Sequence, residues 1–232
     1  QHHEVLTSMA FKWFYRILSK ATASSKEDYA INCRAAIYRT PADTAKDYHN
    51  PVIENFRGDN RLFIAAEIDD NHDLKAIAKL AHTHPEVKFL VTPPIINEER
   101  LNRMAWHFSG NTRLYSQCTP ETALDKVQIL IIDYIADRQH LYEFGTWCYM
   151  GHGISDSPID AAIPVACGLR TCSCPPIRKE PFCRSLIRRG VISVVRNSTQ
   201  LNEWFCRHMD CHDIGQIPSH TTGAIHDNTS VI

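Results

Sequence analysis

A single run of apolar residues limits the folds that this chain can adopt. From Val127 to Asp133 the sequence reads Val-Gln-Ile-Leu-Ile-Ile-Asp, without the regular alternation of apolar and polar residues that marks a half-exposed strand. Such a continuous run is typical of a strand buried on both faces, as in a parallel sheet covered by helices. The run therefore predicts an α/β fold.

The segments on both sides of this run alternate between strand and helix patterns. The predicted strands are 61–66, 87–91, 113–115, 146–150, 169–172 and 191–195, and the predicted helices are 73–82, 98–108, 137–144, 178–189 and 199–209, with a short helix opening at Thr119. This alternation indicates a Rossmann-like parallel sheet with helices on both faces. Ligands bind such folds at the carboxyl ends of the strands.

The first sixty residues lack this regular pattern. Residues 11–20 are aromatic and basic, with apolar residues at helical spacing, whereas residues 21–60 are polar and irregular. We predict an N-terminal helical arm and connector over 1–60 and a Rossmann-like domain over 61–232. Residues 11–20 could pack on their own protein, or could contact a membrane surface through their basic side.

Composition narrows the classes of function. A formal net charge of −1 argues against general nucleic-acid binding, which needs a basic excess. The sequence has no apolar run of about 18 residues and no signal peptide at its start, so we expect a cytoplasmic protein, or one bound peripherally at the inner membrane. Nine cysteines, several of them in apolar runs, indicate a reducing compartment.

The densest set of metal-ligand residue types lies near the end of the chain. Cys206, His208, Cys211 and His212 could supply four ligands to zinc. Their spacing matches no standard zinc finger, and ligands so close together on one helix do not converge easily. A helix over 199–209 places Cys206 on a buried stripe with Leu201 and Phe205, so we predict no metal site there.

Small and basic residues follow the predicted strand 146–150. Gly151-His152-Gly153 opens a loop toward a helix, and a glycine-rich loop at this place lets backbone N–H groups bind a nucleotide phosphate. Arg178 and Lys179 stand at the start of a later predicted helix. They are candidates for anion binding, although a solvated basic helix face explains them equally well.

In order and spacing, these motifs resemble the carboxy-terminal domain of the Kdo (3-deoxy-D-manno-octulosonic acid) transferases, in the form associated with Bacteroidetes. The resemblance runs without a gap over residues 151–195. Further segments that resemble the family are 11–14, 50–59, 120–123, 131–133, 141–142, Gly145 and 223–225.

The resemblance implies a GT-B glycosyltransferase of lipopolysaccharide synthesis. In such an enzyme the first Rossmann-like domain binds the lipid acceptor and supplies a catalytic carboxylate, and the second binds the donor, CMP-Kdo. This sequence resembles the second domain, and the sixty residues before it are too few for another such layer. We therefore expect no catalytic residue and no cofactor here, with CMP-Kdo as the implied donor substrate. The implied donor-site positions are Pro93, Asp133, Gly151, His152, Gly153, Asp160, Arg178 and Lys179.

Several of these positions depart from the family pattern. His152 puts a ring where the family has a glycine, and Asp160 puts a negative charge near the expected phosphate, at a cost of about 1–4 kcal/mol. Hydrophobic residues replace polar ones at Ile95, Ile159, Ile163 and Phe182. The losses fall at strand ends and loops, whereas the strands and helices remain legible.

These departures predict a pseudoenzyme that acts by binding a protein partner. The alternative is a divergent transferase that still binds a CMP-sugar donor, and a weaker one is a zinc-stabilised interaction domain. An open, positively lined cleft near 151–160 favours the transferase, whereas a pocket filled by Ile159, Ile163 and Phe182 favours the binding protein.

Overall fold

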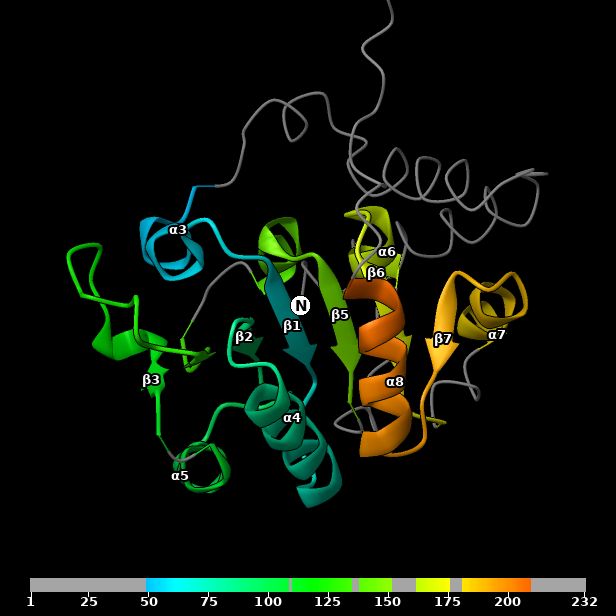
Figure 1. Ribbon diagram of the computed structural model, residues 1–232, viewed down its shortest axis with the longest axis horizontal. Helices are drawn as coiled ribbons and strands as arrows, with labels where there is room; N and C mark the ends of the chain where they lie inside the picture. Colours follow the sequence, from blue (N-terminus) through cyan, green and yellow to red (C-terminus); the bar gives the residue numbers. More distant parts are fainter. Residues whose placement is uncertain (1–48, 109, 135–137, 152–161, 176–180, 210–232) are drawn as a thin grey trace, which may run out of the picture.

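The α/β fold expected from the sequence is confirmed by a computed structural model, which describes residues 49–108, 110–134, 138–151, 162–175 and 181–209. Its parallel strands form one sheet in the order β3-β4-β2-β1-β5-β6-β7 (Figure 1). The strands are β1 (Leu62–Ala66), β2 (Lys88–Val91), β3 (Thr112–Leu114), β4 (Ile129–Ile131), β5 (Trp147–Met150), β6 (Arg170–Ser173) and β7 (Ile192–Val194).

Helices cover both faces of the sheet. One face packs against α3 (Pro51–Arg57), the 3-10 helix η2 (Arg138–Phe144), α6 (Ala162–Ala166) and α7 (Pro181–Arg188). The other face packs against α4 (Asn71–Thr83), α5 (Glu98–His107) and α8 (Ser198–Met209). A second 3-10 helix, η1 (Tyr115–Gln117), follows β3.

Alternation along the central strands divides the core between these two layers. In β1, Ile64 belongs to the cluster under α3, whereas Phe63 and Ala65 belong to the cluster under α4 and α8. All five residues of β1 are buried. Because successive side chains of a strand point to opposite faces, only an apolar run can serve both layers, as the sequence analysis required.

Polar caps fix where three helices begin. The side-chain oxygens of Asn50, Asp70 and Asn97 accept hydrogen bonds from backbone N–H groups three residues further on, in the first turns of α3, α4 and α5. Each cap satisfies an N–H group that the helix itself leaves without a partner. The caps of α4 and α5 follow the exits of β1 and β2, so they position the carboxyl edge of the sheet.

Two sequence predictions are wrong. No helix opens at Thr119: the Thr119 N–H donates to Thr122 Oγ1 at 2.8 Å and the Thr122 N–H to the Thr119 carbonyl at 3.0 Å, which closes a turn instead. The predicted irregular connector also contains α3, whose Val52, Ile53 and Phe56 are buried in the core. The short helix was missed because seven residues carry too little periodicity.

Other elements differ in length or type. The run 127–133 contributes only Ile129–Ile131 to the sheet. Residues 138–144 form a 3-10 helix rather than an α-helix. No helix of the described ranges is both long enough and apolar enough to span a bilayer. Most of the predicted arm, residues 1–48, lies outside those ranges.

Candidate functional site

The sheet order reverses at β1, and this reversal marks the most probable place for a ligand in such a fold. β1 pairs with β2 on one side and with β5 on the other. In open α/β sheets, ligands enter the crevice outside the carboxyl ends of the strands at such a switch point. Here the crevice is bounded by the residues after Ala66 and after Met150.

Gly151, the first residue after β5, lies in this crevice and is closely surrounded. Its N–H donates to the Ala66 carbonyl at 2.8 Å. A Cβ atom at position 151 would lie 2.5 Å from Asp73 Oδ2 and 2.8 Å from the Glu67 carbonyl oxygen. Only glycine fits at this distance, so its absent side chain makes room for protein atoms.

A buried hydrogen bond joins the two sides of the crevice. The Tyr149 hydroxyl donates to Asp73 Oδ1 at 2.6 Å, and Asp73 is fully buried in the first turn of α4. Burial raises the pKa of Tyr149, and the neighbouring Asp73 carboxylate raises it further. The phenol therefore stays protonated and keeps donating to the carboxylate.

Cys174 extends this buried group beyond the end of β6. It is 1% exposed, and burial raises the pKa of its thiol to about 12, with the Asp73 carboxylate as the next cause. The adjacent Ser173 hydroxyl donates to the Met150 carbonyl at 2.9 Å. Because the reactive form of cysteine is the thiolate, Cys174 is a structural thiol rather than a nucleophile.

The exit of β1 turns an apolar side chain into the crevice. Glu67 has a φ of 57°, a left-handed conformation that is uncommon for a residue other than glycine. Ile68 follows with no exposed surface, and its Cδ1 would lie 2.9 Å from a Cβ atom at position 151. Ile68, Asp73 and Tyr149 thus fill the floor of the crevice.

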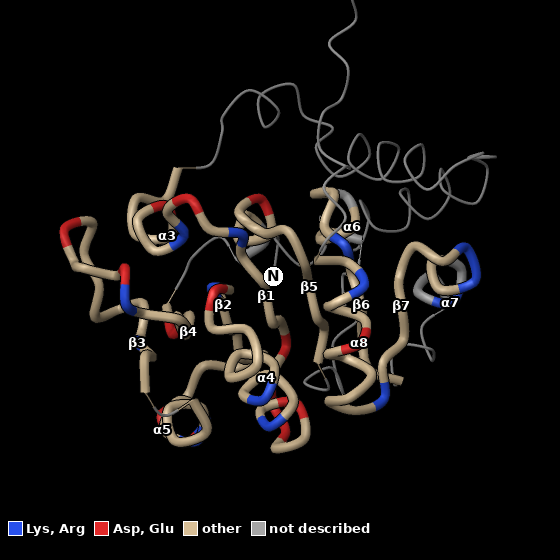
Figure 2. The backbone as a smooth tube through the Cα atoms, viewed as in Figure 1, with Lys and Arg blue, Asp and Glu red and all other residues tan. Residues whose placement is uncertain are grey.

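Carboxylates gather above this floor. Glu67, Asp69, Asp70 and Asp73 lie in the segment where β1 runs into α4, shown in red in Figure 2. Asp69 Oδ1 contacts Arg100 Nε at 2.5 Å and Arg103 Nη2 at 3.5 Å. Both arginines therefore already have a carboxylate partner within the protein.

The structure separates the donor-site positions implied by the family resemblance. Gly151 lies at the switch point, whereas Pro93 and Asp133 follow β2 and β4. Asp133 accepts the Ser116 N–H at 2.8 Å and the Ser116 hydroxyl at 2.5 Å, which ties the exits of β3 and β4 together. The remaining candidates lie outside the described residues: His152, Gly153, Asp160, Arg178 and Lys179. Of the three hydrophobes proposed to fill the pocket, Ile163 is half-buried, Ile159 lies outside the described residues, and the side chain of Phe182 is not described.

Sequence reasoning missed the Asp73–Tyr149 pair. One signal for it existed: Asp70 and Asp73 are spaced as an N-cap and the third residue of a helix. Nothing in the sequence pointed to Tyr149, which lies 76 positions away in a predicted strand.

Two groups of metal-ligand residue types can be assessed. Ligand atoms of Asp70, His72 and Asp73 lie within 4.8 Å of one another, but Asp70 caps α4 and Asp73 accepts from Tyr149. In the second group, His208 Nδ1 lies 2.6 Å from the Trp204 carbonyl oxygen. Cys206 is half-exposed, so the predicted buried stripe is wrong there and Trp204 takes its place. Cys211 and His212 lie outside the described residues.

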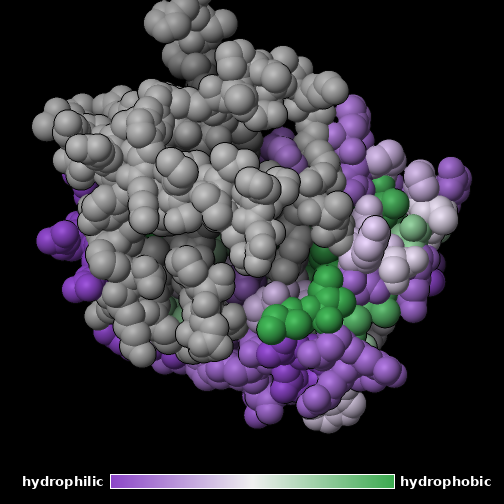
Figure 3. All heavy atoms as spheres, turned by 180° about the vertical axis from the view of Figure 1, so that it is seen from behind, coloured by the Kyte–Doolittle hydropathy of each residue, from purple (hydrophilic) through white to green (hydrophobic). Residues whose placement is uncertain are grey.

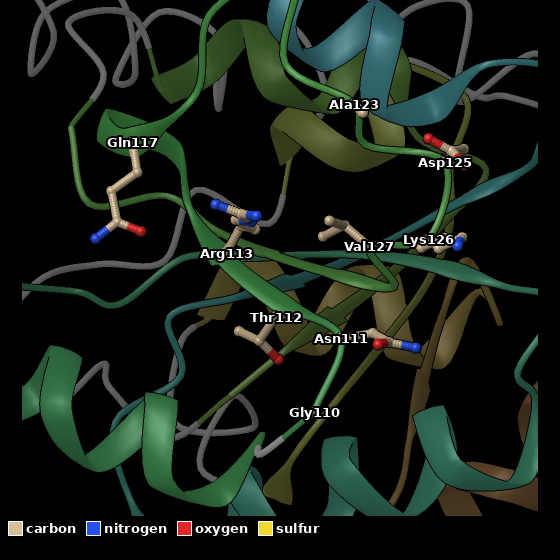
Figure 4. Close-up of a pocket in the computed structure, with 9 residues that line it drawn as sticks. All are labelled: Gly110, Asn111, Thr112, Arg113, Gln117, Ala123, Asp125, Lys126 and Val127. Atoms are coloured by element: carbon tan, nitrogen blue, oxygen red, sulfur yellow. The ribbon is translucent and has the colours of Figure 1, made fainter.

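A hollow of about 660 Å³ lies away from the switch point. Figure 4 shows its walls: residues 110–113 and Gln117 on one side, and Ala123 and 125–127 before β4 on the other. Most of these residues precede or form β3 and precede β4, so the hollow lies beside the sheet edge rather than at the crevice. Its position does not coincide with any predicted donor-site residue.

Comparisons with known proteins support this fold assignment. No protein-family model matches the chain, and no curated protein sequence matches it. A solved structure does match: the C-terminal CMP-Kdo binding domain of WaaA from Acinetobacter baumannii, with a TM-score of 0.51 and 13% sequence identity over 66% of this chain and 83% of that domain. The chain shares the fold of a CMP-Kdo binding domain.

A second structure is similar at a lower score. It is a protein from Listeria monocytogenes assigned as a UDP-N-acetylglucosamine 2-epimerase, with a TM-score of 0.47 and 15% identity over 72% of this chain and 40% of that one. At these identities the comparisons establish fold alone. The fold expected from the resemblance to Kdo transferases is confirmed, and its function stays a prediction.

Proposed function

We propose that this chain is a Kdo transferase-like domain that does not transfer sugar and acts by binding a protein partner. The observation that carries the proposal is the filled crevice at the switch point. Ile68, Asp73 and Tyr149 are buried where a donor nucleotide would enter, and Gly151 is closed against Asp73 and Glu67.

Charge supports the same conclusion. A donor phosphate near the β1 exit would meet Glu67, Asp69 and Asp70, and Arg100 and Arg103 already contact Asp69. Two like charges about 4 Å apart repel by roughly 4 kcal/mol at the effective dielectric constant near a protein surface. This repulsion is enough to remove most of a micromolar affinity, which is about 8 kcal/mol.

The second candidate is a divergent transferase domain that still binds a CMP-sugar. The shared fold with a CMP-Kdo binding domain favours it. Its donor contacts would come from residues beyond the described crevice, above all Arg178 and Lys179. The two candidates make opposite predictions for nucleotide binding.

Calorimetric titration of the full chain with CMP and with CMP-Kdo at low salt distinguishes them. We expect no binding heat up to millimolar ligand, with the WaaA domain from Acinetobacter baumannii as the positive control. Micromolar binding would refute the proposal and establish the second candidate. A search for an acceptor-binding domain supplied by another chain would then follow.

A further inference from the structure

Three large hydrophobic side chains are exposed at neighbouring exits of the sheet. Ile95 is 59% exposed and Ile96 41% exposed after β2, and Tyr134 is 70% exposed after β4. β2 and β4 are adjacent parallel strands, so these residues leave the same edge of the sheet. Single exposed hydrophobes are ordinary, whereas several at adjacent strand exits indicate a contact surface.

Carboxylates border these hydrophobes. Exposed Glu98 and Glu99 begin α5 directly after the Ile95–Ile96 segment, and Asp133 precedes Tyr134. On the face opposite to that of Figure 1, Figure 3 shows green hydrophobic residues beside purple hydrophilic ones. We call Ile95, Ile96, Tyr134, Glu98, Glu99 and Asp133 the carboxyl-edge surface.

One segment of the chain has the complementary composition. Residues 11–20 contain Phe11, Trp13, Phe14 and Tyr15, together with Lys12, Arg16 and Lys20, and no acidic residue. They lie outside the described residues. Residues 21–48 can extend by about 3.3 Å each, which is long enough to reach any part of a domain this size.

We propose that residues 11–20 bind the carboxyl-edge surface of their own chain. Their aromatic side chains cover Ile95, Ile96 and Tyr134, and their basic side chains face Glu98, Glu99 and Asp133. The inference rests on the proposed function, because a segment bound here controls the access of a protein partner to the same edge.

Zero-length carbodiimide cross-linking of the full chain tests the contact directly. We expect amide links from Lys12 or Lys20 to Glu98 or Glu99, within the monomer and with a yield that does not depend on protein concentration. Links found only between two copies, or the absence of links, would overturn the proposal.

Charge exchange provides the second test, read as the rate of chymotrypsin cleavage after the aromatic residues 13–15. E98K/E99K and K12E/R16E/K20E should each raise this rate about fivefold, the effect of losing two exposed ion pairs. Combining both sets should restore protection. E121K/E203K, which reverses two exposed charges away from this surface, is the matched control and should leave the rate unchanged.

The outcomes separate this inference from other readings. Additive effects without restoration would overturn it, as would protection that arises only on anionic phospholipid vesicles, which would assign residues 11–20 to a membrane surface. Nucleotide binding in the calorimetric experiment would refute the proposed function without changing the cross-links, so the two failures can be told apart.

Discussion

Asp73 and Tyr149 show how a place that suits a ligand can be used for stability instead. The carboxylate is fully buried and is matched by a hydroxyl at 2.6 Å. A buried polar group is costly unless it is hydrogen-bonded, so each partner makes the burial of the other tolerable. A pair of this kind resists change, because losing one member leaves the other without its partner.

Replacing Tyr149 by Phe tests this pairing. The variant removes the hydroxyl and leaves Asp73 Oδ1 without that donor, so we expect the free energy of unfolding to fall by about 1.5–3 kcal/mol. Urea denaturation measures the change. Tyr134→Phe removes an exposed hydroxyl and should stay within about 0.5 kcal/mol of the parent protein. An equal effect of the two variants would contradict the role given to the pair.

The buried thiol of Cys174 makes stability depend on alkaline pH. Its pKa is about 12 in the folded protein against 9.0 for an ordinary cysteine. Between these values the unfolded chain binds fewer protons than the folded one, so stability falls as pH rises from 9 to 12. The slope for this one group is at most about 1.4 kcal/mol per pH unit.

Cys174→Ala should therefore flatten the decline of unfolding free energy above pH 9, measured by denaturation at successive pH values. Cys206→Ala, at a half-exposed thiol, is the control and should keep the parent slope. If both variants behaved alike, the slope would have to come from other groups, such as the buried Tyr149.

Among the elements, β2 and the turn before β4 depend on one buried lysine. Lys88 is 7% exposed, and its Nζ donates to the carbonyls of Leu124, Asp125 and Val127 at 2.8, 2.9 and 2.6 Å. The ammonium also lies 5.0 Å from the Phe56 ring centroid. Burial lowers the pKa of Lys88, and the Asp125 carboxylate partly offsets this effect.

Lys88→Met should lower the free energy of unfolding by about 2–4 kcal/mol, because three carbonyls lose their donor at once. Hydrogen exchange at residues 127–129 should accelerate more than exchange in β1. Lys79→Met, at an exposed position of α4, is the control and should have little effect. Uniform acceleration across the sheet would argue against a local role.

Much of the element pattern could be predicted, because it depends on local sequence. The strands β1, β2, β5 and β6 and the helices α4 and α8 lie within a few residues of their predicted bounds. The site could not be predicted in the same way. Asp73, Tyr149 and Cys174 meet only through the order of strands, and a strand pattern does not reveal which strand is its neighbour. Lys88 likewise looked like one polar residue in an apolar strand.

For the whole molecule, net charge and local charge tell different stories. The formal net charge of −1 suggests an electrically neutral protein. The exits of β1, β2 and β4 nevertheless carry Asp69, Glu99 and Asp133 among other carboxylates, close to exposed hydrophobes. The fold of a donor-binding domain is thus combined with an edge that suits protein contact better than a phosphate.

The strand order also fixes when this domain can form during synthesis. β1 lies at the middle of the sheet, yet Ile64 pairs with Cys148, which the ribosome adds 84 residues later. Until then one side of β1 has unpaired backbone groups and exposed apolar side chains, and such edges associate readily with other chains. A nascent chain released before β5 would therefore be a candidate for aggregation or chaperone capture, even though β1, β2 and β4 are already complete.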